Sequence, residues 1–487
     1  MESNNKLLNT LIKQINKPDD LVVREVFYKK RKCYIAYLNC ISNSQLIGLE
    51  IIKPIMAVLE TSKRVDLNLI KETIICGSKT EVVDDLDEMK RNILIGQTLI
   101  FYNSNQSCIK VDTIQLEHRS ITEPPTSAVI YGPREGFVES IKTNISLVRK
   151  RLPTPNLVVE GMNIGRYTKT KVSVVYIKDI ADDKVVKRIH KQLEKIDIDG
   201  VIDSQYLLEF LEEKPLSIFK QVGKTEKPDV VTAKILEGRV AILVDGSPVV
   251  LTVPFIFLED LQNSDDYYQK SFKITMIRFI RMFGIVIATL LPGIYVAMQL
   301  NHYKVLPVKF IVTIMNSTQD LPFTPFIETL FIVIVFELLY EASLRMPKAL
   351  GIALSVIGAL ILGDTAVKAG FISPPAVLFV ALSSTCFYTV PDQSVQLSFI
   401  RMLFTIIGGT FYMLGILVGV VFVFVYLVGM NGYGSPYIAP YSPFIKEDVK
   451  DSAIKLSIKR QITRPVCIPN KNRVRMKIGE KGNGTND

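Results

Sequence analysis

The stretch Leu321–Ile372 constrains this chain most, because it is apolar enough to enter a lipid bilayer and yet carries charged side chains. Its ionisable residues include Glu328, Glu337, Glu341, Arg345, Asp364 and Lys368. An unpaired, unhydrated charge at membrane depth costs about 2.5–3.5 kcal/mol on insertion scales. Glu337, Glu341 and Arg345 are spaced by four residues, with acid before base, and Asp364 and Lys368 repeat that spacing. The stretch therefore predicts packed membrane helices with a charged inner face.

Two interpretations of these charges stay open at this point. In the first, the charges pair inside the membrane and only hold the helices together. In the second, they form a polar lining for ions, and the combination of Asp364, Thr365 and Lys368 supports this interpretation. A stripe of small residues lies between the charged segments and would let another helix approach closely: Gly351, Ser355, Ala359 and Gly363.

The composition fits a soluble part joined to a membrane part. The chain has 487 residues, of which 48% are hydrophobic and 22% are charged, which is too apolar for an ordinary soluble enzyme and too charged for a pure membrane bundle. With apolar spans present, a membrane explains the net charge of +10 more simply than nucleic acid does. The first twenty residues lack the apolar core of a signal peptide, so we expect the soluble part in the cytosol.

The predicted fold class is an α+β cytosolic N-terminal region of two subdomains, followed by an α-helical multi-span membrane domain. Residues 1–150 form the first subdomain with a connecting helix, and residues 151–265 form a second, α/β subdomain. Residues 266–430 form the membrane domain, and residues 431–487 form a basic cytosolic tail that we expect to attract anionic lipid.

Hydrophobic periodicity predicts the elements of the two subdomains. Predicted strands are Lys32–Leu38, a strand pair in Ile93–Tyr102 around Gly96, Cys108–Leu116 and Lys171–Ile177. Residues 1–25 are predicted as a short amphipathic helix or a disordered lead, and Leu49–Leu59 and Leu67–Thr73 as helical or mixed. Predicted helices are Phe137–Arg151, Asp182–Ile196 and Gly200–Leu211. Arg239–Pro254 reads as a hairpin, because Asp245-Gly246 between two β-branched runs suits a tight turn.

Two membrane spans are long enough to be secure, Phe279–Gln299 and Met402–Val428, and the second contains Gly415 and Gly419 as a GxxxG pair. Basic residues place the start of the first span and the tail on the cytosolic side. Five complete passes would put the tail outside. Either Met402–Val428 folds back on itself or Pro375–Tyr388 is re-entrant, and the half-length of Pro375–Tyr388 favours the second.

No motif in the chain indicates catalysis or a cofactor. Six cysteines and three histidines are scattered without metal-ligand spacing, and no nucleophile–base set can be assembled. We therefore expect no metal, no cofactor and no enzyme.

The loop Gly132-Pro133-Arg134-Glu135-Gly136 lacks a phosphate-loop pattern and reads as a rigid turn between the subdomains. It is also a candidate for subunit contact and gating.

Seven short stretches, in this order, carry a resemblance: Gly132–Asn144, Asp197–Asp203, Thr225–Asp229, Glu237–Pro248, Pro322–Leu330, Glu337–Pro347 and Gly434–Pro440. On these stretches, the chain resembles the A subunit of GerA-type spore germinant receptors over nearly its whole length. Three positions depart from the family pattern. Lys227 stands where the family usually has Arg, and Ser127 and Tyr131 replace residues that are more often charged.

The resemblance implies a nutrient-triggered complex in the inner membrane of the dormant spore. It implies that this subunit self-associates and conducts monovalent cations, and that its partners are a transporter-like B subunit and a lipoprotein C subunit. It also implies that the cytosolic domain supplies subunit contacts and gating.

Two alternatives remain beside a homo-oligomeric, ligand-gated cation channel. A secondary transporter would show inverted repeats and broken helices near the membrane midplane. A non-conducting membrane scaffold would bind its partners and pass no ions.

Overall fold

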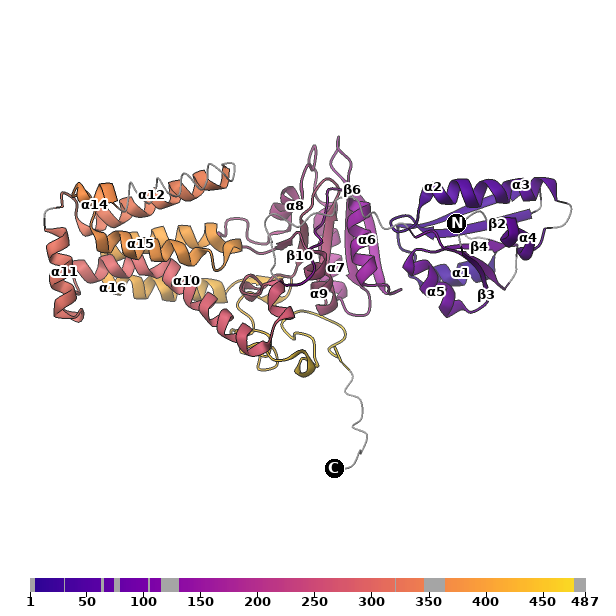
Figure 1. Ribbon diagram of the computed structural model, residues 1–487. Coiled ribbons are helices and arrows are strands. Elements are labelled where there is room, and N and C mark those ends of the chain that lie inside the picture. Colours follow the sequence, from indigo (N-terminus) through magenta and orange to yellow (C-terminus); the bar gives the residue numbers. More distant parts are fainter. Residues whose placement is uncertain are drawn as a thin grey trace, which may run out of the picture.

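The computed structural model describes residues 5–29, 31–62, 65–73, 79–103, 106–114, 131–319, 321–345 and 364–476. It contains two sheet-based units followed by a bundle of helices, and the C-terminal segment returns to the second unit (Figure 1).

The first unit is a five-stranded antiparallel sheet in the order β1-β2-β4-β5-β3. Its strands are β1 (Leu21–Tyr28), β2 (Arg31–Leu38), β3 (Thr80–Val83), β4 (Thr98–Tyr102) and β5 (Cys108–Val111). Its helices are α1 (Lys6–Gln14), α2 (Ser44–Leu46), which continues through a π-helical turn (Ile47–Ile52) into α3 (Lys53–Thr61), α4 (Leu67–Thr73) and α5 (Leu86–Ile95).

Alternation along the central strands explains why helices cover both faces of this sheet. In β2, Cys33 and Ile35 pack in the core shared with α3 and α4, whereas Tyr34 and Ala36 pack in the core shared with α1 and α5. Successive side chains of a strand point to opposite faces. A strand that is apolar on both faces therefore needs a helical layer on each side.

The second unit repeats this topology. Its antiparallel sheet has the order β6-β7-β9-β10-β8, and its elements follow the same sequence of helix, two strands, helices, strand, helix and two strands. The strands are β6 (Leu157–Ile164), β7 (Thr170–Ile177), β8 (Gly223–Thr225), β9 (Val240–Val244) and β10 (Val250–Val253). The helices are α6 (Ile141–Arg151), α7 (Asp183–Glu194), α8 (Ser204–Leu211) and α9 (Pro228–Glu237).

The repeat extends to its turns. Helices α5 and α9 each end at a glycine in the left-handed conformation, Gly96 with φ +106° and Gly238 with φ +109°, directly before a central strand. Glycine adopts this backbone conformation without steric cost and is the usual residue after a helix end. The buried Arg149–Asp20 ion pair, 2.7 Å long, then joins α6 of the second unit to the start of the first sheet.

The helical region begins with two short 3-10 turns (Phe257–Leu261 and Ser264–Tyr268) and continues into α10 (Ser271–Leu300). A 3-10 turn (Tyr303–Val305) and α11 (Val308–Thr318) lie at the far end of the bundle (Figure 1). The remaining helices are α12 (Pro325–Arg345), α14 (Ala366–Lys368), α15 (Pro374–Phe387), a 3-10 turn (Pro391–Gln393) and α16 (Ser394–Val428). Among the described residues, Ser271–Leu300 and Pro391–Val428 are the two helices that are long and apolar enough to cross a membrane.

Helix α16 folds back on itself at Tyr412, whose φ of 56° and ψ of −149° are not helical. A Cβ atom on Gly419 would lie 2.9 Å from the ring of Phe404. Fifteen residues of straight helix would separate these positions by about 22 Å. The predicted GxxxG pair thus packs inside this hairpin, since Gly415 also lies against Phe411 and Ile407.

This fold-back corrects the preference for Pro375–Tyr388 as the re-entrant segment. Helix α15 runs in one direction along α10, from Tyr295, whose ring centroid is 4.8 Å from that of Phe379, to Gly284, against which Thr389 packs. The turn therefore lies in Met402–Val428, the other alternative. Both ends of α16 lie beside the second unit, where Lys214 Nζ donates to Gly429 O at 3.2 Å and Gln393 Nε2 donates to Asp260 Oδ2 at 3.2 Å.

The C-terminal segment is folded rather than extended over residues 431–476. Two short strands, β11 (Asn431–Gly432) and β12 (Ser435–Pro436), are followed by loops and a 3-10 turn (Ile458–Arg460). Arg464 Nε donates to Leu236 O at 2.7 Å, and Lys471 Nζ pairs with Asp183 at 2.6 Å. Basic residues that we expected to face lipid thus contact the second unit.

Several predicted elements need correction. Ile93–Tyr102 is the end of a helix and one strand, not a strand pair, because Gly96 terminates α5. The strands β1, β3 and β6 were not predicted. The loop of the hairpin in Arg239–Pro254 spans residues 245–249 rather than a two-residue turn. Helix α6 packs in the core of the second unit, although the division at residue 150 groups it with the first. The predicted stripe from Gly351 to Gly363 lies outside the described residues.

Candidate functional site

The buried polar centre of the bundle is built around Arg401, whose side chain is 1% exposed. Its guanidinium pairs with Glu337 of α12 and donates to Ser384 Oγ at 2.7 Å. Arg401 also donates to Ser383 Oγ at 3.4 Å, and Ser383 Oγ donates in turn to Ala288 O of α10 at 2.7 Å. Four helices, α10, α12, α15 and α16, therefore meet at one buried cation.

This pairing determines the role of Glu337. A buried guanidinium is tolerated only when a counter-charge and hydrogen-bond acceptors replace its lost hydration. Glu337 supplies the charge, and the ring of Phe387 lies 4.4 Å from the guanidinium carbon. Of the two interpretations of the membrane charges, Glu337 fits the one in which pairing holds the helices together.

Glu328 is fully buried at the end of the bundle farther from the sheet units. The backbone N–H of Ser373, just before α15, donates to Glu328 Oε1 at 2.5 Å, while Oε2 has no hydrogen-bond partner among the residues that the structure describes. The contact ties the first turn of α12 to the first turn of α15. The Glu328 contact is separate from the Arg401 cluster, because Glu328 and Glu337 are about 13 Å apart along α12.

The other predicted charges form exposed pairs within single helical segments. Glu341 pairs with Arg345, and these side chains are 56% and 80% exposed. Asp364 pairs with Lys368 at 2.7 Å, and these are 56% and 74% exposed. The structure thus separates the predicted set into one buried acid, Glu328, one partly buried acid, Glu337, and two exposed ion pairs, with Thr365 beside the second pair. Sequence reasoning did not predict the pairing of Glu337 with Arg401.

The connecting loop packs against the second unit. Gly132 has φ +109°, and a Cβ atom there would lie 2.6 Å from the ring of Tyr268. Glu135 pairs with Lys150 at 3.2 Å and also with Arg151. Three further loop residues, Pro133, Arg134 and Gly136, flank these contacts. Of these three, Gly136 is buried.

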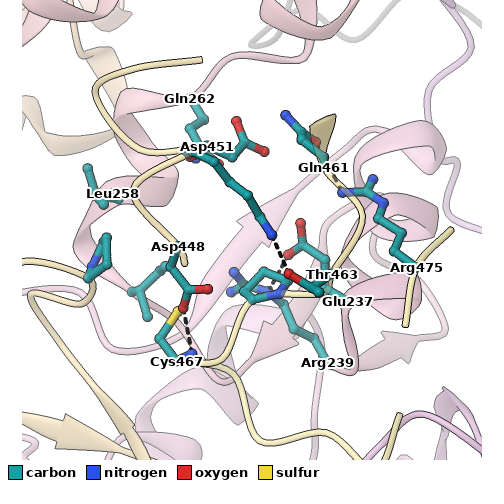
Figure 2. Close-up of a pocket in the computed structure, with 14 residues that line it drawn as sticks. Glu237, Arg239, Leu258, Gln262, Asp448, Asp451, Gln461, Thr463, Cys467 and Arg475 are labelled. Atoms are coloured by element: carbon teal, nitrogen blue, oxygen red, sulfur yellow. Dashed lines mark hydrogen bonds and ion pairs between the residues drawn. The ribbon is translucent and has the colours of Figure 1, made fainter. Parts of the chain in front are cut away.

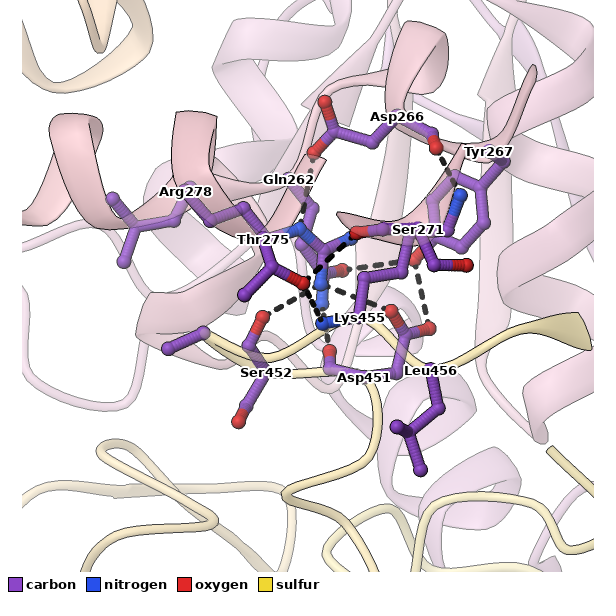
Figure 3. A network of polar contacts seen from close by, with 12 residues as sticks. Gln262, Asp266, Tyr267, Ser271, Thr275, Arg278, Asp451, Ser452, Lys455 and Leu456 are labelled. Atoms are coloured by element: carbon purple, nitrogen blue, oxygen red, sulfur yellow. Dashed lines mark hydrogen bonds and ion pairs between the residues drawn. The ribbon is translucent and has the colours of Figure 1, made fainter. Parts of the chain in front are cut away.

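A second polar cluster joins the base of α10 to the C-terminal segment (Figure 3). Arg278, which is 1% exposed, donates to Asp266 Oδ2 at 3.1 Å, to Asp451 Oδ1 at 3.0 Å and to Ser452 O at 2.6 Å. Arg281 adds two hydrogen bonds to Asp266, at 2.9 and 3.1 Å. Burial raises the pKa of the Asp451 carboxyl, against the opposing effect of Arg278. Any movement of the base of α10 must therefore carry this segment with it.

The same region contains further buried ion pairs. Burial by itself would raise the pKa of the Glu259 carboxyl, but Arg239 and Lys234 outweigh burial and hold it below its ordinary value. Lys220 pairs with Asp260 at 2.9 Å, and Asp260 also accepts from Gln393 at the start of α16. Through Asp260, these contacts connect Lys220 of the second unit to the start of α16. Arg278 similarly connects α10 to the C-terminal segment.

The cavity in this region is small. It has a volume of about 40 Å³, and Glu237, Arg239, Asp448, Gln461 and Arg475 are among its lining residues (Figure 2). This volume holds a few water molecules, whereas ligand pockets usually measure about 300–1,000 Å³. Among the described residues, no group of three or more histidine, cysteine, aspartate or glutamate side chains is placed to hold a metal ion.

Comparisons with known proteins match this chain to a described protein family. Residues 9–467 match the family model described as Bacillus/Clostridium GerA spore germination protein. Spore germination protein KA of Bacillus subtilis is 33% identical over 470 residues, which cover 95% of this chain and 86% of that protein. The uncharacterized membrane protein YfkQ of Bacillus subtilis is 34% identical, with coverage of 90% of this chain and 85% of that protein.

One solved structure is also similar. The N-terminal domain of the A subunit of the Bacillus megaterium spore germinant receptor GerK3 is 30% identical, covering 51% of this chain and 94% of that chain, with a TM-score of 0.41. The family match spans nearly the whole chain, and the resemblance of the seven short stretches is thereby confirmed. This chain belongs to the GerA family of spore germination proteins.

Proposed function

We propose that this chain is the A subunit of a nutrient-sensing germinant receptor in the spore inner membrane, and that copies of it assemble into a ligand-gated channel for monovalent cations. The family membership and the A-subunit structure among its relatives support the first part. A transporter-like B subunit and a lipoprotein C subunit would complete the receptor. The sheet units and the C-terminal segment would share the cytosolic side, in keeping with both ends of α16 lying beside the second unit.

The exposed ion pairs carry the channel proposal. Asp364–Lys368 and Glu341–Arg345 lie on the surface of a bundle whose other exposed side chains are largely apolar, such as Phe331, Leu338 and Leu417. Charges on a membrane helix are tolerated when they face protein or water. Neighbouring copies of the chain around a hydrated path would provide both protein and water. Glu328 and Glu337 would then support the helices that carry the exposed pairs.

Conductance measurements test this proposal. Purified full-length chain, alone and with its B and C partners, is reconstituted in planar bilayers. We expect cation conductance and a changed selectivity in Asp364→Asn. The matched control is Asp183→Asn, because Asp183 is also an exposed aspartate paired with a lysine, but it lies outside the bundle. A conductance that is absent under all conditions would contradict the channel and favour the non-conducting scaffold.

A further inference from the structure

The loop after α8 presents an exposed apolar tip. Leu216 is 98% exposed and Ile218 is 41% exposed, although each lies within three residues of the buried Phe219. Apolar side chains this open to solvent on a short loop indicate a contact surface when they adjoin other exposed apolar surface. We call residues 214–218 the apolar loop.

Contacts on both sides of Leu216 hold this loop at the end of α16. Lys214 Nζ donates to Gly429 O at 3.2 Å and lies 5.7 Å from the ring centroid of Tyr426. Ser217 Oγ lies 3.8 Å from Met430 Sδ. The tip is thereby placed beside the last turn of an apolar helix rather than out in the solvent around the sheet.

The exposed surface of α16 continues toward the loop. Val421, Phe422 and Val425, in the last two turns before Gly429, are 54%, 72% and 62% exposed. Just beyond them come the half-exposed ring of Tyr426 and the ammonium group of Lys214. Apolar side chains followed by tyrosine and lysine are the arrangement found where a helix leaves the hydrocarbon core.

The two acids just before the loop are both engaged: Glu212 accepts the backbone N–H of Gln221, and burial raises the pKa of its carboxyl. Glu213 pairs with Arg188 at 2.8 Å and accepts the backbone N–H of Tyr433 at 3.0 Å. Lys220 is buried against Asp260. Lys214 is thus the exposed charge that accompanies Pro215, Leu216 and Ile218, and a cation suits an anionic lipid surface.

From this geometry we propose that the apolar loop inserts into the headgroup region of the bilayer and seats the second unit on the membrane surface. The partner is the lipid itself, which contacts Leu216 and Ile218 while Lys214 faces the phosphates. This inference rests on the proposed embedding of α16 in a membrane and adds to it a lipid contact made by the soluble part of the chain.

The absence of tryptophan from the chain permits a direct test. Full-length Leu216→Trp, reconstituted in vesicles, carries a single tryptophan at a position where the side chain packs against nothing that the change would disturb. We expect lipids brominated near the headgroup to quench its emission more than lipids brominated near the chain ends. We also expect aqueous iodide to quench it weakly. Ile218→Trp provides a second reporter on the same loop.

Two controls separate the possible results. Phe422→Trp reports on α16, and Tyr167→Trp reports on an 83% exposed position in the β6–β7 turn. If Phe422→Trp is quenched by brominated lipid while Leu216→Trp behaves like Tyr167→Trp, the loop proposal is overturned and the membrane proposal stands. Leu216→Trp shielded from both quenchers would also overturn it, because a protein surface would then cover the loop. No lipid quenching of Phe422→Trp would instead contradict the membrane embedding.

Discussion

At the scale of single residues, the Glu337–Arg401 pair is the contact most sensitive to change. Glu337→Gln leaves a buried guanidinium without a counter-charge, and breaking such a pair costs about 3–5 kcal/mol. We expect a markedly lower thermal unfolding midpoint, measured by circular dichroism in detergent. The double change to leucine at both positions should recover much of this loss, because it removes the unpaired charge.

The matched control for this prediction is Glu341→Gln. Glu341 also pairs with an arginine, but the pair is exposed, and such pairs contribute little to stability. An equal decrease in the unfolding midpoint for both variants would contradict the role assigned to Arg401.

Glu259 gives a pH prediction at the same scale. Arg239 and Lys234 hold its pKa below the ordinary value despite burial, so the folded state favours the ionised carboxylate. Its stabilisation is present above about pH 4.3, the ordinary pKa of glutamate, and is lost as the pH falls through the lower folded value. The stability difference between the native chain and Glu259→Gln should therefore shrink on acidification.

Chemical unfolding between pH 7 and pH 3 measures this difference. Glu209→Gln, at an exposed position of α8, serves as the control and should follow the native chain at every pH. A difference between the native chain and Glu259→Gln that stayed constant over this range would contradict the ionised state assigned to Glu259.

At the scale of elements, the crossing of α10 and α16 depends on two glycines. A Cβ atom on Gly293 would lie 2.4 Å from Phe404 O, and one on Gly408 would lie 2.4 Å from Gly293 O. Gly293→Val should therefore separate the helices and destabilise the bundle by about 1–3 kcal/mol. Gly429→Ala, whose nearest neighbours would be 3.5 Å away, should be close to neutral in the same thermal unfolding measurement.

Elements also show how far sequence reasoning reached. Helix α7 follows from hydrophobic periodicity, because it buries a regular stripe. Strand β2 follows from its short apolar run, and the long apolar helices follow from their length and composition. The end of α5 could have been found too, since Asp85 caps its start and Gly96 follows its last residue. The same glycine-then-strand pattern recurs at Gly238. The fold-back at Tyr412 has no such signal, because it occurs without proline or glycine at the turn.

The candidate site was predictable only in part, for a related reason. Spacing by four residues correctly pairs Glu341 with Arg345 and Asp364 with Lys368. The partner of Glu337 is 64 residues away on another helix, and only the packing of α12 against α16 brings it into contact. Local spacing carries no information on such a pair.

At the scale of the whole molecule, the C-terminal segment acts as a clamp between the second unit and the base of α10. Asp451→Ala removes one of the three acceptors of Arg278 and also the acceptor of Tyr267 OH. We expect faster trypsin cleavage at Lys455 and Lys459 in the full-length chain, because the segment loses its anchor. Glu447→Ala, at an exposed position three residues before Lys450, should leave the cleavage rate unchanged, and equal rates in both variants would contradict the clamp.

The backbone contact between Gly293 and Gly408 bears on how the bundle can move. With no side chain between the two helices, neither can slide past the other without a steric clash. They must therefore move as one rigid unit, whose base is held by Arg278–Asp266 and Gln393–Asp260 contacts to the two 3-10 turns that follow the second sheet. A signal that tilts the second unit would thus tilt both helices together, and the end of α12 that carries the exposed Glu341–Arg345 pair is the part left to move.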